Sequence, residues 1–412
     1  RNPQKFIFMS ATNPLWASAV LLTERMVQPM DKPTVQDIFH RFYPAYLDQY
    51  SPSPVQAKVA HNIMNCKTGA YGANVCVCED CGFVQIHYNS CRNRCCPMCQ
   101  AVPKEMWMDA RREDVLDAPY FHLVFTVPDI LNPVIYSNQR LLYDALYHAA
   151  SSTISELTAD PKHLGAKVGY ICILHTWGSE MNFHPHIHAI LLGGGLASNN
   201  QWKDNGENFF LPIRVISKMF RGKYLEELKR LWEEDKLVFH GTAEKFRNHY
   251  TFKELLDSCY GMDWIPHCKK TFNGAQTVIK YLGKYTHRIA VSNHRIVRMD
   301  DDTVTFLVKD YRNEGQWKEL TISGVEFVRR FLMHVPPRRF VRIRHYGLLC
   351  SRTKSQKLTL CRNLLGCKKY LSKLRDMEMP EILEHLYGIK VCVCKACGGH
   401  LGKPQMRMPL RC

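Results

Sequence analysis

The chain has 412 residues, 46% of them hydrophobic, and its 55 Lys and Arg outnumber its 38 Asp and Glu to give a net charge of +17. A chain of this length can bury a substantial core, and it contains no apolar run of about 18 residues that would cross a bilayer. The composition therefore excludes a membrane-spanning protein and favours a location in the reducing cytoplasm. Because Met30 could start the natural protein, we expect residues 1–29 to be a non-native or disordered leader.

Hydrophobic periodicity and turn residues predict an α+β protein. Helices are predicted at residues 34–50, from there to about 66, and at 104–116, 136–158, 213–234 and 273–289. Strands are predicted at residues 121–127, 169–177, 184–192, 295–298, 303–308 and 319–322. The polar turn 178–182 joins two of these strands into a hairpin, and the glycines at 193–195 are expected to end the second strand.

Eleven of the 18 cysteines lie in two short windows, which favours metal binding over disulfide bonds. Two Cys-x2-Cys pairs fourteen residues apart predict one four-cysteine zinc site, made of Cys78, Cys81, Cys96 and Cys99. In the same window Cys76, His87, Cys91 and Cys95 could hold a second zinc ion or none. Near the C-terminus, Cys392, Cys394, Cys397 and Cys412 offer a further half-site whose partner ligands the spacing does not fix.

Three histidines, His184, His186 and His188, alternate along the predicted strand 184–192. Alternation places them on one face of the strand, about 6 to 7 Å apart in succession. A single buried histidine is usually a core residue, but three in register predict a metal site. Imidazoles alone would suit Zn²⁺, and added oxygen ligands would suit Mg²⁺ or Mn²⁺.

Tyr281 and Tyr285 lie four residues apart on the predicted helix 273–289 and therefore share one of its faces. Two tyrosines on an amphipathic helix are most often packing residues. Beside a metal-binding strand, however, a phenol could attack a phosphate and form a phosphotyrosine. A tyrosine has a pKa of about 10, so it needs help at neutral pH, and Lys284 and Arg288 could supply positive charge.

The segment from Arg329 to Arg375 contains fourteen Lys and Arg and no Asp or Glu. A solvated charged surface normally mixes both signs, so this segment predicts a polyanionic partner. Aromatic residues interleave the charges, which suits stacking on bases beside phosphate contacts. The candidate DNA contacts in this segment are Arg338, Arg339, Arg342 and Arg344.

Four stretches occur in the order found in two-tyrosine HUH transposases, and the chain resembles the IS91 insertion-sequence family from about residue 37 to 347. The stretches are residues 89–100, 176–188, 281–285 and 342–347. Cys95 departs from the family string, which has histidine there. The resemblance implies a five-stranded antiparallel sheet of the HUH endonuclease type with flanking helices. It also implies Mg²⁺ or Mn²⁺ on His186 and His188, with Gln276 or His184 as third ligand, and nucleophiles at Tyr281 and Tyr285.

The family's activity would be rolling-circle transposition of single-stranded DNA through 5′-phosphotyrosine intermediates, by a nucleoid-associated bacterial protein that acts on element ends and target sites. The absence of a Gly-x4-Gly-Lys-Ser/Thr loop fits, because rejoining by phosphotyrosine needs no nucleotide hydrolysis. After the leader, the expected domains are a zinc-binding domain at 30–103, a nuclease domain at 104–325 with a helical insertion at 200–265, a basic DNA-binding region at 326–375, and a C-terminal helix with a zinc knuckle at 376–412.

Two other classes of protein explain part of the sequence. A non-catalytic zinc-ribbon DNA-binding regulator would use the cysteines and the basic segment, but leaves the histidine row and the paired tyrosines unused. A zinc-dependent hydrolase would use the histidines, but lacks a His-Glu-x2-His arrangement and leaves the basic segment unexplained.

Overall fold

The computed structural model describes residues 32–204, 211–264, 266–272, 278, 283, 290–310 and 313–407. The expected leader therefore lies outside the described residues. So do Gln276, Tyr281, Lys284, Tyr285, Arg288 and Cys412. Of the predicted helix 273–289, Val278 and Gly283 are described, and both are helical.

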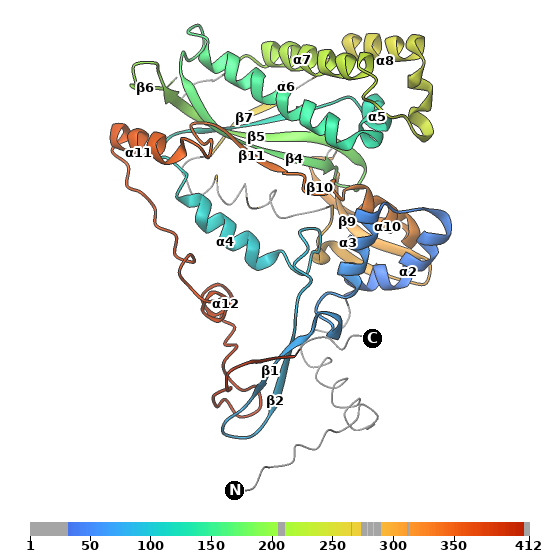
Figure 1. Ribbon diagram of the computed structural model, residues 1–412, viewed down its shortest axis with the longest axis vertical. Coiled ribbons are helices and arrows are strands. Elements are labelled where there is room, and N and C mark those ends of the chain that lie inside the picture. Colours follow the sequence, from blue (N-terminus) through green and yellow to red (C-terminus); the bar gives the residue numbers. More distant parts are fainter. Residues whose placement is uncertain are drawn as a thin grey trace.

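An antiparallel sheet forms the centre of the molecule (Figure 1). Its strands follow the spatial order β11-β4-β5-β3-β7, and the short β6 pairs with β5. The strands are β3 (Tyr120–Thr126), β4 (Lys167–Trp177), β5 (Phe183–Leu196), β6 (Trp202–Asp204), β7 (His267–Phe272) and β11 (Ile343–Gly347). The predicted α+β class, with an antiparallel sheet and flanking helices, is confirmed.

Helices cover both faces of this sheet, so β5 is apolar on both sides. Ile187, Ala189 and Leu191 join the core beneath α6 and α7, whereas Ile190 and Leu192 pack on the other face with Met108 and Val278. The first face carries α5 (Asn132–Ser137), α6 (Gln139–Ala159), α7 (Ile213–Glu233) and α8 (His249–Gly261). The second face carries α4 (Ala101–Arg112) and α11 (Lys354–Leu365).

A second core joins segments from both ends of the sequence. It contains α2 (Val35–Gln49), α3 (Pro54–Met64), β8 (Ile296–Met299), β9 (Thr303–Asp310), β10 (Gln316–Ser323) and α10 (Gly324–Met333). The last three strands form their own sheet, and the Phe39 and Phe331 rings meet edge to face at 5.2 Å between α2 and α10. Both α2 and α3 begin at a capping box, which fixes their first turns.

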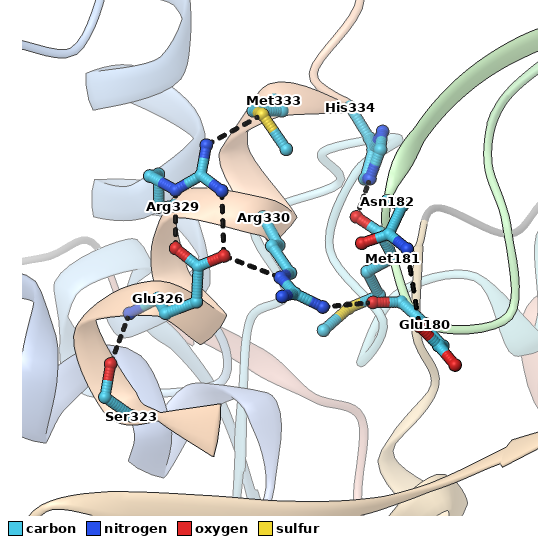
Figure 2. Close-up of polar contacts among 9 residues, drawn as sticks. All are labelled: Glu180, Met181, Asn182, Ser323, Glu326, Arg329, Arg330, Met333 and His334. Carbon is cyan, nitrogen blue, oxygen red and sulfur yellow. Dashed lines mark hydrogen bonds and ion pairs between the residues drawn. The ribbon is translucent and has the colours of Figure 1, made fainter. Parts of the chain in front are cut away.

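Helix α10 fastens this second core to the turn between β4 and β5 (Figure 2). Arg330 donates to the Glu180 carbonyl at 2.9 Å, and the His334 ring lies 2.9 Å from the Met181 carbonyl. Glu326 holds Arg330 in place and accepts two further hydrogen bonds from Arg329. The hairpin that carries the histidine row is therefore fixed at its turn.

The remaining elements form a small sheet at the opposite end of the molecule from α7 (Figure 1). Strand β1 (Ala73–Val77) pairs with β2 (Val84–Tyr88) on one side and with the C-terminal β12 (Gln405–Arg407) on the other. Helix α12 (Met379–Tyr387) precedes β12, and short 3-10 helices lie at Gly69–Tyr71, Asp129–Leu131, Gly241–Arg247 and Asn293–Arg295. None of the helices described is long and apolar enough to cross a membrane.

One sequence-based expectation about strands was wrong, and one strand of the central sheet was not predicted. The glycines at 193–195 do not end β5, which continues to Leu196. They are there because neighbouring segments approach the strand so closely that a Cβ would not fit. A Cβ on Gly193 would lie 2.9 Å from the Pro119 carbonyl oxygen. Residues 343–347, expected within a DNA-binding region, form the edge strand β11 of the central sheet.

Candidate active site and metal centres

Three histidines from the β4–β5 hairpin meet on one face of the central sheet. His175 lies directly opposite His186 in the antiparallel register, and His188 follows two residues along β5. Ring nitrogens of the three lie within 4.8 Å of one another, and all three residues are buried. His186 Nε2 and His188 Nε2 are 3.0 Å apart, the separation of two nitrogens that lie about 2.1 Å from one ion at an angle of about 90°.

Hydrogen bonds behind these rings orient the nitrogens toward a common point. His186 Nδ1 donates to the His184 backbone carbonyl at 2.7 Å, which leaves a lone pair on Nε2. His188 Nδ1 lies 2.8 Å from Nε2 of His122 on β3, and the Trp177 ring stacks on His175 with centroids 4.6 Å apart. His122 and Trp177 therefore support the rings of His188 and His175.

Burial keeps the imidazoles uncharged. Removal from water, followed by repulsion from the neighbouring His184, lowers the pKa of His186 to about 3. Burial likewise lowers the pKa of His188 well below its ordinary value, with further repulsion from His175. Neutral imidazole is the form that ligates a metal, so this set is prepared for a cation at neutral pH.

His184 does not join the cluster. The register shifts between His175 and Trp177, where β5 has one more residue than β4, and this irregularity breaks the alternation that the sequence pattern assumed. The His184 ring instead lies 3.2 Å from the Asp129 carboxylate at the surface. The sequence offered His184 as a possible third ligand, but the third histidine of the cluster is His175.

Two described residues of the predicted helix 273–289, Val278 and Gly283, lie on the same side of the sheet as the histidines. Val278 is buried with Ile173 and Ile190, which lie two residues from His175 and His188 on their strands. A Cβ on Gly283 would overlap the thioether of Met108 on α4, so this residue lies directly against that helix. Tyr281 falls between these two anchored positions in the sequence.

The cysteines form two groups of four instead of the predicted single site. Cys66, Cys91, Cys96 and Cys99 form one group, and Cys78, Cys81, Cys394 and Cys397 form the other. The predicted grouping was wrong because Cys78 and Cys81 lie at the tip of the β1–β2 hairpin. The five residues of β2, about 17 Å of extended chain, separate them from Cys96 and Cys99.

The other predicted zinc ligands are not brought together. Of the second set, only Cys91 enters a group, and His87 pairs with Gln85 at 2.7 Å. Cys76 and Cys95 are buried beside the two groups without belonging to either. Cys392 is exposed and belongs to neither group.

Comparison with known proteins places this chain among transposases. The family described as "Putative transposase" matches residues 169–357, and the "Transposase zinc-binding domain" of IS91 type matches residues 38–127. "Putative transposase y4qJ" of Sinorhizobium fredii (strain NBRC 101917 / NGR234) is 40% identical over 89% of this chain and 93% of its own length. The chain belongs to the IS91 family of transposases.

The chain is also similar to a second transposase and to one solved structure. The transposase for insertion sequence element IS801 of Pseudomonas savastanoi pv. phaseolicola is 30% identical over 74% of this chain and 72% of its own. The conjugative relaxase TrwC, solved with oriT DNA, is 15% identical over 42% of this chain and 68% of its own. The TM-score of 0.22 for that structure is too low to argue from.

Family membership makes this protein a DNA-acting enzyme that contains structural zinc. The histidine cluster lies on β4 and β5 of the central sheet, whereas the cysteine groups involve residues that follow α3 and β1.

The basic segment of this IS91-family transposase is less available for DNA than its sequence indicates. Arg344 pairs with Asp144 and lies 4.0 Å above the Tyr147 ring, and Arg342 is half-buried near Trp177. Arg329 and Arg330 pair with Glu326 on the same helix, whereas Lys354 and Arg375 pair with Asp114 and Glu113 from a distant part of the chain. Within the described residues no ion pair involves Arg338, Arg339, Arg352, Lys357, Lys368, Lys369 or Lys373.

Sequence reasoning missed His175, His122 and Cys66. The turn at 178–182 could not reveal His175, because a regular register with Trp177 opposite Phe183 would place Leu174 opposite His186, and only the irregularity in β5 brings His175 there. His122 and Cys66 had no local signal either, since each comes from an element whose neighbours only the tertiary fold decides.

Proposed function

We propose that this transposase cuts and rejoins single-stranded DNA through covalent 5′-phosphotyrosine intermediates, with Tyr281 and Tyr285 as nucleophiles. The observation that carries the proposal is the convergence of His175, His186 and His188 on the sheet face that also buries Val278, while Gly283 lies against Met108 of α4. A regulator that only binds DNA has no use for three buried imidazoles whose nitrogens lie this close together.

The donor set fits a divalent transition metal ion. Three imidazole nitrogens suit Mn²⁺ better than Mg²⁺, because Mg²⁺ prefers oxygen ligands. When bound, such an ion supplies Lewis-acid polarisation of the scissile phosphate. The residues that would hold it are His175, His186 and His188, with His122 behind His188 as an orienting partner.

The reaction balances without a co-reactant. A tyrosine oxygen bonds to phosphorus as the phenol loses its proton, and the bond from phosphorus to the 3′ oxygen breaks. The 3′ oxygen takes up a proton and leaves as a hydroxyl. The phosphotyrosine keeps the free energy of the broken phosphodiester, so a later 3′ hydroxyl can displace the tyrosine and rejoin the strand.

A cleavage assay on oligonucleotides tests this function. The protein is incubated with single-stranded DNA carrying an element end and with Mn²⁺ or Mg²⁺, and the products are separated under denaturing conditions. We expect a covalent protein–DNA adduct on single strands and none on the same sequence as a duplex. DNA binding without an adduct under both ions would support the zinc-ribbon regulator instead, and release of a free 5′ phosphate would support a metal-dependent hydrolase.

A further inference from the structure

The second cysteine group joins two parts of the chain that are more than 300 residues apart. Cys78 Sγ lies 3.5 Å from Cys397 Sγ, and Cys81 Sγ lies 3.7 Å from Cys394 Sγ. All four sulfurs lie within 4.8 Å of one another. Four thiolates about 2.3 Å from a tetrahedral ion would be about 3.8 Å apart, whereas a disulfide needs about 2.05 Å. The spacing therefore suits one metal ion and not a pair of disulfides.

The two halves of this group are copies of one short motif. Residues 75–82 read VCVCEDCG and residues 391–398 read VCVCKACG, identical at six of eight positions. The glycine that follows each pair has a left-handed backbone, with φ of 71° at Gly82 and 77° at Gly398. This repeat is an observation independent of the sulfur positions.

The backbone of the two copies makes the same hydrogen bonds. In the first copy, Cys78 N donates to the Phe83 carbonyl at 2.9 Å and Gly82 N donates to the Cys78 carbonyl at 3.0 Å. In the second, Cys394 N donates to the Gly399 carbonyl at 2.8 Å and Gly398 N donates to the Cys394 carbonyl at 3.0 Å. Gly399 N also lies 3.4 Å from Cys397 Sγ, a contact that stabilises a thiolate. Each copy is thus a formed metal-binding knuckle.

Contacts around the sulfurs lock the two knuckles together. Glu79 N donates to the His400 carbonyl at 3.1 Å, His400 N donates to the Asp80 carboxylate at 3.1 Å, and β12 pairs with β1. The zinc-binding domain matched by the family ends at residue 127, so it includes Cys78 and Cys81 but not their partners. Cys394 and Cys397 belong to the C-terminal strap, which we define as residues 366–404.

We propose that Cys78, Cys81, Cys394 and Cys397 bind a Zn²⁺ ion that clasps the C-terminal strap to the N-terminal zinc-binding domain. The strap leaves α11, passes α12 and reaches the β1–β2 hairpin (Figure 1). Near the start of the strap, Asp109 on α4 accepts hydrogen bonds from Tyr370, Ser372 and the Leu374 backbone. The strap is thus attached at α4 and at the zinc clasp, with Lys368, Lys369 and Lys373 exposed near the α4 attachment. This site is separate from the Cys66 group and does not depend on the proposed tyrosine chemistry.

Zinc stoichiometry of the full chain tests the clasp. The protein is purified under reducing conditions, and bound metals are measured by elemental analysis. Relative to wild type, the double variants Cys394→Ser/Cys397→Ser and Cys78→Ser/Cys81→Ser should each lose one equivalent of zinc. Cys392→Ser is the matched control, because it lies in the same motif outside the group, and it should lose none. Unchanged zinc in either double variant, equal loss in the control, or iron in place of zinc would overturn the proposal.

Two further measurements keep the proposal falsifiable if a double variant folds poorly. Cys397→His keeps four ligands, so after exchange into Co²⁺ the thiolate charge-transfer absorption should weaken while total Co²⁺ stays constant; an identical spectrum would contradict the site. In addition, chelation of wild type should speed tryptic cleavage at Lys395 and Lys403 several-fold, because the metal ion helps to hold this part of the strap against the β1–β2 hairpin. Cleavage there at an unchanged rate after loss of the metal would contradict the clasp.

Discussion

At the scale of single residues, we predict that substitution of any of the three clustered histidines slows strand cleavage far more than substitution of their neighbour His184. His175→Ala, His186→Ala or His188→Ala should each slow single-turnover strand cleavage by at least about a hundredfold, because a bound metal contributes several kcal/mol to the transition state. His184→Ala should slow it by less than about threefold, since its ring faces Asp129 at the surface. The measurement is adduct formation at saturating single-stranded DNA.

DNA affinity provides the control for these variants. Binding comes mainly from phosphate contacts, so all four variants should bind the same oligonucleotide within about threefold of wild type. Cleavage by His175→Ala at the wild-type rate would remove it from the metal site.

The charge of Glu326 stabilises α10 through ion pairs with Arg329 and Arg330. Hydrogen bonds from Arg329, together with those from Arg330, lower the pKa of the Glu326 carboxyl below its ordinary value of 4.5. A lowered pKa means that the ionised form is favoured in the folded state. The stabilisation is therefore present above pH 4.5 and is lost as the pH falls through the folded-state pKa.

Glu326→Gln should lower the free energy of unfolding by about 1 kcal/mol at pH 7, a value reduced for partial exposure. The difference from wild type should shrink when denaturant unfolding is repeated at pH 3.5. Glu319→Gln is the control, because its pair with Arg298 is exposed and should contribute almost nothing. A constant difference between pH 7 and pH 3.5 would show that packing and not charge holds this contact.

At the scale of elements, the contact between Gly283 and α4 positions the tyrosine-bearing segment. Gly283→Ala would press a methyl group against the buried Met108, so we expect the cleavage rate to fall several-fold with DNA affinity unchanged. Met108→Ala in the same chain should restore much of the rate by removing the overlap. Gly222→Ala on α7 has open space around it and should change nothing. A Gly283→Ala enzyme as active as wild type would show that this contact does not position the nucleophiles.

The basic residues without ion-pair partners should carry the salt dependence of binding. If Arg338 and Arg339 each contact a phosphate of single-stranded DNA, replacing both with Gln should reduce the logarithmic salt slope by about 1.4. Arg375→Gln should leave the slope unchanged, because Arg375 already pairs with Glu113. Binding measured by fluorescence anisotropy across a salt series gives both slopes. Equal slopes for wild type and the double variant would place the DNA path elsewhere.

Local patterns in the sequence predicted the elements well and their assembly less well. The β4–β5 hairpin, α2 and α7 follow from periodicity and turn residues, because these signals lie within each segment. The pairing of Cys78 with Cys397, or of β11 with β4, depends on contacts between distant segments, which spacing along the chain does not encode. The charge of Arg344 was visible in the sequence, but its partner Asp144 lies 200 residues away.

At the scale of the whole molecule, the fold brings a histidine cluster and the described residues Val278 and Gly283 of the predicted tyrosine-bearing helix to one face of a sheet, and it places one cysteine group after α3 and the other at the β1–β2 hairpin. Tyr281 and Tyr285 lie one helical turn, about 5.4 Å, apart on the predicted helix, so they cannot both be in line with one phosphate at the same time. The two tyrosines must therefore act in turn or on different strands. Each Tyr→Phe variant removes only a hydroxyl, so a change in activity reports chemistry and not folding.

The most direct test of this account is to trap the protein–DNA adduct on a single-stranded element end, digest it, and identify the modified peptide by mass spectrometry. We predict a nucleotide phosphate on Tyr281 or Tyr285 in wild type, adducts in at least one of Tyr281→Phe and Tyr285→Phe, and none in the double variant, with defective complete transposition in both single variants. A covalent adduct in the double variant, or a phosphate mapped to any other residue, would contradict the account.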